Sequence, residues 1–223
     1  RKSEGFALYS GRYGMPVNRI GVLATGTGTS LDVLRSNILT VIGGAQIQGS
    51  IMATGAASAF FARSPSSSLQ VNPLFTAVEG GRIEIGSSVY PWNSLNASAT
   101  ILHSADAGSW IGLSNVSSLT INEGASSGLT YSINARRGGT IDLSGVGVLT
   151  GPGTNDWLVF NLDTSGDIRL DSLYQMTGRN RFNINVPSYE FPDLINVSGI
   201  ELNGGTNVIV LLPELQTLNF GNV

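Results

Sequence analysis

One serine lies in a sequence pattern that is typical of hydrolases. Gly124, Ser126 and Gly128 form the pattern G-x-S-x-G, in which the serine acts as a nucleophile on a turn between a strand and a helix. The segment LTYSIN at 129–134 follows, and its alternation of apolar and polar residues predicts a strand instead. His103, the only histidine that could serve as the base, precedes the serine. We therefore interpret the motif as a turn rich in glycine and serine.

His103 is the second candidate for chemistry, because an imidazole can act as a general base or bind a metal. It stands at the end of an apolar segment, and Asp106 follows three residues later. A lone histidine at a strand end more often forms structural hydrogen bonds, and we favour that interpretation.

Three acidic residues suggest a calcium site. Asp163, Asp167 and Asp171 follow one another at intervals of four residues in the segment NLDTSGDIRLDS. Carboxylate oxygens are ligands that Ca²⁺ prefers, but neither the EF-hand spacing nor the glycine-rich nonapeptide of calcium-binding β-rolls is present. A turn that holds one Ca²⁺ ion and a solvated turn without metal therefore both stay open, and no other cofactor is expected.

Aromatic residues form the last group of candidates, because their rings can stack against sugars. We expect a binding role for Trp110, Trp157 and Tyr174, and Trp92 and Tyr131 belong to the same group. Trp110 and Trp157 begin apolar segments, so packing in a core or at its edge is the alternative for them.

The composition restricts the partners of the chain. Charged residues make up 12% of its 223 residues, the net charge is −3, and Lys2 is the single lysine. No basic run extends beyond Arg136 and Arg137, so we expect neither nucleic acid nor an anionic membrane as a partner. The chain has no cysteine for disulfides or thiolate metal sites, and no apolar run of the roughly 18 residues needed to insert into a membrane.

The elements that carry these residues come from an internal repeat. Residues 139–151, GTIDLSGVGVLTG, align without a gap to residues 166–178, GDIRLDSLYQMTG. The alignment pairs Ile141 with Ile168, and each copy ends in Thr-Gly. An apolar segment containing Phe-Asn follows each copy, WLVFNL at 157–162 and RFNINV at 181–186. One repeat unit is therefore predicted to contain three short strands.

The first strand of this unit has a broader pattern, in which two apolar residues flank an outward residue and a turn former follows. Six segments match it: 81–86, 117–122, 139–144, 166–171, 198–203 and 216–221. We expect a further copy near 99–104, within the longest interval. If these segments stack in register, about 4.8 Å apart, their outward residues form a surface ladder that includes Glu84, Asp142, Arg169 and Glu201.

These observations predict an all-β fold, a single-stranded parallel β-helix (β-solenoid) with about 18 to 32 residues per coil. We expect right-handed winding, the general preference of parallel crossovers. Residues 1–66 fit the pattern poorly and are expected to form irregular N-terminal coils or a cap, whereas 67–223 form one continuous solenoid. A β-sandwich is the alternative, but its strands would not repeat as an ordered triplet.

The segment GGTIDLSGVGVLTG followed by WLVFNL resembles the imperfect β-helical repeats of large bacterial surface proteins, of the filamentous-haemagglutinin and autotransporter-passenger type. The resemblance covers 67–223 and identifies no functional residue. It implies a non-catalytic structural or adhesive segment that is extracellular or at the cell surface, with polysaccharide or other surface proteins as partners. Because the chain starts without Met and its last segment predicts an uncapped strand, we expect it to continue into other domains of a larger chain.

A polysaccharide-degrading β-helix enzyme, a lyase, hydrolase or tailspike-like depolymerase, is the alternative function. Glycoside hydrolysis needs two carboxyl groups about 5 to 9.5 Å apart. Asp142 and Glu201 lie two rungs apart in the predicted ladder, near the upper end of that range. Arg169 between them would keep both ionised, whereas a general acid needs a raised pKa. We therefore expect a protein without catalytic activity.

Overall fold

The protein is described from a computed structural model. The described residues are 50–219, with gaps at 66, 70–71, 93–96, 123–127 and 154, together with short strands before residue 48. In this part of the chain all regular structure is β-strand. None of the described residues belongs to a helix long and apolar enough to cross a membrane.

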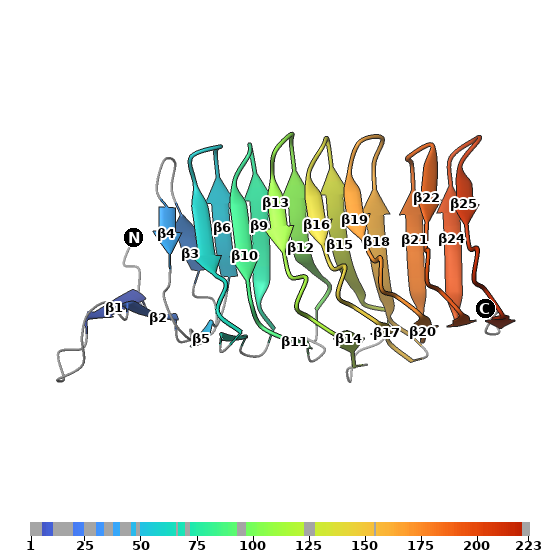
Figure 1. The fold of residues 1–223 in the computed structure, drawn as a ribbon, viewed down its shortest axis with the longest axis horizontal. Coiled ribbons are helices and arrows are strands. Elements are labelled where there is room, and N and C mark those ends of the chain that lie inside the picture. Colours follow the sequence, from blue (N-terminus) through green and yellow to red (C-terminus); the bar gives the residue numbers. More distant parts are fainter. Residues whose placement is uncertain are drawn as a thin grey trace.

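Three parallel sheets contain most of the strands (Figure 1). Sheet 1 consists of β3 (Ser30–Val33), β6 (Ser50–Thr54), β9 (Leu74–Val78), β12 (Ala99–Ala105), β15 (Thr130–Arg136), β18 (Trp157–Leu162), β21 (Asn180–Ile184) and β24 (Ile200–Gly204). Sheet 2 consists of β4 (Ile38–Thr40), β7 (Ala59–Ala62), β10 (Arg82–Ile85), β13 (Trp110–Gly112), β16 (Thr140–Asp142) and β19 (Asp167–Arg169). Sheet 3 consists of β11 (Val89–Trp92), β14 (Ser118–Ile121), β17 (Val148–Thr150), β20 (Gln175–Thr177), β23 (Asn196–Ser198) and β26 (Thr217–Asn219).

Three strand pairs stand apart from these sheets. β5 (Gln46–Ile47) pairs with β8 (Ser68–Leu69), and β22 (Ser188–Glu190) pairs with β25 (Ile209–Leu211), both in parallel. β1 (Phe6–Ser10) and β2 (Ile20–Ala24) are antiparallel. Because β3, β4, β6 and β7 already belong to sheets 1 and 2, both sheets start within 1–66. The division of the chain at residue 66 stays a prediction.

The order of the strands along the chain confirms the predicted triplet. From β9 to β20 the chain enters sheet 1, sheet 2 and sheet 3 in turn, so each strand lies beside the strand three places earlier. All pairs within these sheets are parallel, which excludes the antiparallel sandwich. The stacked parallel sheets of Figure 1 are consistent with a β-solenoid.

Rows of apolar side chains hold the sheets together. Ile141 is the register partner of Ile168, as the repeat predicts, and both are at most 1% exposed. In sheet 1 the rings of Phe160 and Phe182 stack with their centroids 4.3 Å apart. Burial of each such side chain contributes about 1.5 to 3 kcal/mol. Trp92 and Tyr131, the other two candidates for sugar stacking, belong to this core: Trp92 is 2% exposed and Tyr131 is fully buried.

The sequence pattern of the first strand of the repeat unit occurs in all three sheets. The prediction that all matching segments stack in one sheet is therefore wrong. Segments 81–86, 139–144 and 166–171 contain strands of sheet 2, as predicted. Segments 117–122 and 216–221 contain β14 and β26 of sheet 3, while 198–203 and 99–104 contain β24 and β12 of sheet 1. The strand of sheet 2 that lies between β10 and β16 is β13, which none of these segments contains. Strands in all three sheets alternate buried and more exposed residues, for example β9, β10 and β14, so alternation alone does not identify the sheet of a strand.

Candidate functional site

His103 lies on the outward side of β12 and is the register partner of Asn134. Its Nδ1 atom is buried without a hydrogen-bond partner, so the predicted structural hydrogen bond is absent at that atom. Burial, together with the charges of Arg136 and Arg137, lowers the pKa of His103. Gly124 and Ser126 of the G-x-S-x-G motif lie outside the described residues.

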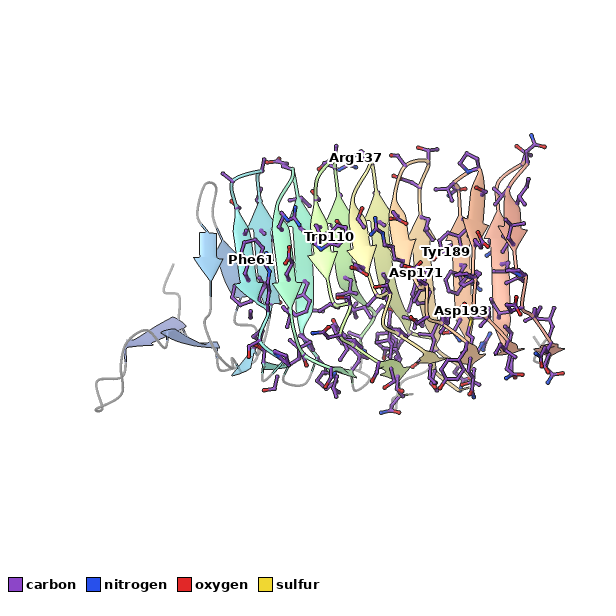
Figure 2. The ribbon with its side chains drawn as sticks, in the orientation of Figure 1. Phe61, Trp110, Arg137, Asp171, Tyr189 and Asp193 are labelled. Atoms are coloured by element: carbon purple, nitrogen blue, oxygen red, sulfur yellow. The ribbon has the colours of Figure 1, made fainter. Side chains whose placement is uncertain are left out.

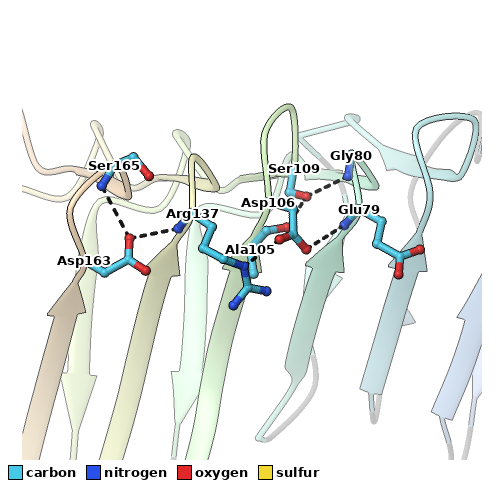
Figure 3. Close-up of polar contacts among 8 residues, drawn as sticks. All are labelled: Glu79, Gly80, Ala105, Asp106, Ser109, Arg137, Asp163 and Ser165. Atoms are coloured by element: carbon cyan, nitrogen blue, oxygen red, sulfur yellow. Dashed lines mark hydrogen bonds and ion pairs between the residues drawn. The ribbon is translucent and has the colours of Figure 1, made fainter.

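A row of polar contacts connects the turns that lead from sheet 1 to sheet 2 (Figure 3). Asp106 accepts hydrogen bonds from the backbone N–H of Glu79 (3.4 Å) and from Nε of Arg137 (2.7 Å). Asp163 accepts hydrogen bonds from the backbone N–H groups of Arg137 (2.8 Å) and Ser165 (3.4 Å). The hydrogen bond from Arg137 lowers the pKa of Asp106. These carboxylates join successive turns, which is a structural role.

The three residues of the predicted calcium site do not converge. Asp163 and Asp171 lie beyond opposite ends of β19, while Asp167 begins that strand. Oδ2 of Asp167 accepts a hydrogen bond from Nε of Arg169 (3.0 Å), and Asp163 belongs to the turn contacts above. Figure 2 shows Asp171 away from the turns that carry Arg137. Within the described residues, no group of three histidine or acidic side chains could hold a metal ion.

The three predicted sugar-stacking residues lie at separate places. Trp110 belongs to β13 of sheet 2, Trp157 to β18 of sheet 1, and Tyr174 to the turn before β20. The guanidinium carbons of Arg179 and Arg181 lie 4.0 and 4.2 Å from the ring centroid of Trp157, so cations cover this ring. A single binding surface that contains all three aromatic residues is therefore absent.

The predicted charge ladder is present in part. Glu84, Gly112, Asp142 and Arg169 lie in one register row of sheet 2, with Gly112 between the two carboxylates. Asp142 and Arg169 are neighbours, as predicted, although the hydrogen bond of Arg169 is to Asp167 in its own strand. In this register row, the position between Glu84 and Asp142 is therefore a glycine, which has no side chain.

Glu201 does not belong to this ladder, and its assignment to it was wrong. It lies in β24 of sheet 1, where its register partner is Arg181. Nη2 of Arg181 donates a hydrogen bond to Glu201 (2.9 Å), and this bond is the main cause of the lowered pKa of Glu201. The predicted arrangement of Asp142 and Glu201 on either side of Arg169 is therefore absent.

A hollow of about 310 Å³ lies on the outward face of sheet 2, and we call it the Trp110 hollow. Strands β10, β13 and β16 and the segments that follow β7, β10 and β13 provide its lining. The lining residues with polar or aromatic side chains include Arg63, Arg82, Glu84, Trp110, Asn115 and Asp142. Figure 2 places Trp110 on this face of the stacked strands.

Gly112 makes room for the indole of Trp110. A Cβ atom at position 112 would lie 2.7 Å from Nε1 of Trp110 and 3.3 Å from Cγ of Glu84. Because no side chain occupies this position, the indole extends along the strand from 110 toward 112. The guanidinium carbons of Arg82 and Arg169 lie 5.8 and 5.2 Å from its ring centroid. Trp110 is half-buried, and two cations lie beside its ring.

The two carboxylates of the hollow lie on either side of β13. Since neighbouring strands are about 4.8 Å apart, the Cα atoms of Glu84 and Asp142 are separated by roughly 9.6 Å. Burial opposes ionisation of Glu84, but hydrogen bonds from Arg63 and Arg82 outweigh it and lower the pKa. Glu84 is therefore ionised near neutral pH, where it accepts hydrogen bonds and does not act as a general acid.

Several residues of this hollow were not found from the sequence. Gly112 and Arg63 belong to no motif, and Asn115 belongs only to the short N-x-S pattern Asn115-Val116-Ser117, which does not indicate a ligand site. A signal was available in the segment 109–114, SWIGLS, which matches the pattern of sheet 2 with glycine at the outward position. That match places Trp110 and Gly112 between Glu84 and Asp142.

No protein family, no curated protein and no solved structure matches this chain. The resemblance to bacterial surface β-helices therefore stays an expectation, and the function has to be argued from the geometry.

Proposed function

We propose that this chain is a non-catalytic structural or adhesive segment of a secreted or cell-surface protein. Its strands form a right-handed β-solenoid with about 18 to 32 residues per coil. The observation that carries the proposal is the parallel register that continues along sheet 1 from β3 to β24 around one apolar core. A stack of this kind is stiff and presents the same outward positions at regular intervals.

A ladder of amides on sheet 1 supports a rigid, repetitive surface. Asn134, Asn161, Asn183 and Asn203 are successive register partners. Their side chains form hydrogen bonds of 2.6, 2.7 and 3.2 Å from one strand to the next. Each such bond contributes about 0.5 to 1.5 kcal/mol. Uncharged polar rows also fit the low charge of the sequence and favour contacts with neutral polar partners.

A polysaccharide-degrading enzyme is the second candidate, and the two carboxylates of the Trp110 hollow favour it. Glycoside hydrolysis requires one carboxyl group that stays protonated until it donates to the leaving group. The arginines around Glu84 lower its pKa and so oppose this role. The geometry therefore supports binding better than hydrolysis.

Incubation of the purified chain with a panel of polysaccharides tests the proposal when both binding and released reducing ends are measured. We expect no release of reducing ends above that of a Glu84→Gln, Asp142→Asn double variant. Release that the double variant lacks would support the enzyme instead. Small-angle scattering of the same sample tests the structural part, since a rigid rod gives an elongated particle and a collapsed or flexible chain does not.

A further inference from the structure

We propose that the Trp110 hollow binds an uncharged saccharide of one or two pyranose rings, with a ring against the indole of Trp110. This inference rests on the proposed non-catalytic function and assigns it a site and a class of ligand. It follows from the size of the hollow, the position of the indole, the balance of charge and the hydrogen-bonding groups of the lining.

The size of the hollow favours a small ligand. Its volume of about 310 Å³ is at the lower end of the roughly 300 to 1,000 Å³ that small-molecule sites have. A ligand of one or two sugar rings fits this volume, whereas a folded protein partner would contact the flat sheet around it. The glycine in the centre of the row leaves space for the indole of Trp110, between two strands that carry carboxylates.

The indole of Trp110 provides an apolar surface in an otherwise polar hollow. Gly112 allows the ring to lie along the strand, and Trp110 is only partly buried. The cations beside it are 5.8 and 5.2 Å from the ring centroid, compared with 4.0 and 4.2 Å at Trp157. The cations at Trp110 therefore lie farther from the ring than those at Trp157, and the C–H face of a pyranose is an apolar surface of suitable shape for the indole.

The charge of the lining favours a neutral ligand. Arg63 and Arg82 contribute two positive charges to the lining, and Glu84 and Asp142 contribute two negative charges. Both arginines form ion pairs with Glu84, so neither offers an unpaired cation to an acidic sugar. Arg169 beside the Trp110 ring is ion-paired with Asp167, so this pair adds no net charge. An acidic saccharide would approach the carboxylates, and a diamine would approach the guanidinium groups, without a net attraction.

The polar groups of the hollow match the hydroxyl groups of a sugar. Carboxylates accept two or more hydrogen bonds, and an amide both donates and accepts. Asp142 uses Oδ1 to accept a bond from the backbone N–H of Ser144 (3.0 Å), and Nδ2 of Asn115 donates to the carbonyl of Gly86 (3.3 Å). These contacts fix the two side chains, and no hydrogen bond from the described part of the chain reaches Oδ2 of Asp142 or Oδ1 of Asn115. Neighbouring sugar hydroxyls are donors for such oxygens.

Titration of the ¹⁵N-labelled full chain with small sugars tests the proposal by NMR. The chain has three tryptophans, so Trp110→Phe assigns the indole N–H signal of Trp110. The probes are maltose, cellobiose, lactose and diacetylchitobiose as neutral disaccharides, with digalacturonate and cadaverine as charged comparisons. We expect a saturable shift of the Trp110 signal with at least one neutral disaccharide, and at least tenfold weaker binding of both charged probes.

Two glycine variants provide a matched pair. Gly112→Ala places a Cβ atom 2.7 Å from Nε1 of Trp110, and Gly147→Ala places one 2.7 Å from Cε1 of Tyr174, outside the hollow. We expect Gly112→Ala to weaken binding of the neutral sugar at least tenfold and Gly147→Ala to change it less than twofold. If Gly112→Ala does not fold, as judged by circular dichroism, Asp142→Asn takes its place, with an expected loss of at least fivefold.

The proposal is overturned if none of the four neutral disaccharides shifts the Trp110 signal, if the charged probes bind as tightly, or if both glycine variants weaken binding equally. None of these results bears on the elongated shape that we expect from small-angle scattering. Conversely, release of reducing ends with normal sugar binding would overturn the non-catalytic function and leave the site in place.

Discussion

Replacement of Ile141 by alanine tests the apolar stacking that holds the sheets together. Ile141 is fully buried in β16, and its register partners Ile111 and Ile168 are at most 1% exposed. The substitution removes three carbon groups, worth about 0.8 kcal/mol each or roughly 2.4 kcal/mol together. The cavity that remains adds to this loss, because isoleucine-to-alanine changes in cores cost about 2 to 5 kcal/mol. We expect the free energy of unfolding to fall by about 3 kcal/mol.

Urea unfolding followed by circular dichroism measures this loss. Thr140→Ala is the matched control, because Thr140 precedes Ile141 in β16 and its side chain points outward and is half-buried. Surface changes of this kind usually alter stability by less than about 0.5 kcal/mol. The reasoning is refuted if Ile141→Ala costs no more than Thr140→Ala, since Ile141 would then not lie in a packed interior.

Three further predictions concern polar groups. Asn161→Ala removes part-buried hydrogen bonds of 2.6 and 2.7 Å and should cost about 1 to 3 kcal/mol in urea unfolding. Asn203→Ala removes two exposed bonds, 3.2 Å to Asn183 and 2.9 Å to Glu201, and should cost less because water can replace them; equal losses would contradict the ladder. The folded-state pKa of Glu84 lies below its usual 4.5, so its ionised form stabilises the fold above about pH 4.5, and this contribution is lost as the pH falls through the lower folded-state pKa. In Glu84→Gln the free energy of unfolding should therefore fall less steeply as the pH is lowered. An unchanged fall at acidic pH would contradict the ion pairs. Burial raises the pKa of Tyr189, whose hydroxyl donates to the carbonyl of Ile168. In alkaline titration of the folded protein, the absorbance change from tyrosine ionisation should therefore be the same in Tyr189→Phe as in the unaltered chain. A smaller absorbance change in Tyr189→Phe would show that this phenol ionises in the folded protein.

The repeat could be predicted from the sequence because two neighbouring coils keep the same length and the same inward residues. Residues 139–151 and 166–178 differ by no insertion, so Ile141 and Ile168 align in sequence and also in the sheet. In the following segments Phe160 lies beside Phe182, although their separation is 22 residues (182 − 160) compared with 27 for Ile141 and Ile168 (168 − 141). Where successive coils have different lengths, the alignment fails, although the inward residues still stack.

The sheet to which each strand belongs could not be predicted from alternation alone. Glu201 occupies an outward position between apolar residues, as Asp142 does, but its strand belongs to sheet 1. The Trp110 hollow could not be predicted from the sequence for a related reason. The Trp110 hollow depends on a glycine whose role appears only when β10, β13 and β16 lie side by side.

Pulsed electron-electron distance measurements test the central claim, the parallel stacking of successive coils, most directly. The chain has no cysteine, so spin labels can be placed at Val89, Ser118 and Thr217, which are exposed positions in one register row of sheet 3. At about 4.8 Å per strand, the distance from Thr217 should be about 19 Å to Ser118, four strands away, and about 24 Å to Val89, five strands away. Distances that do not increase by one strand spacing between these two pairs would contradict the stacked parallel fold.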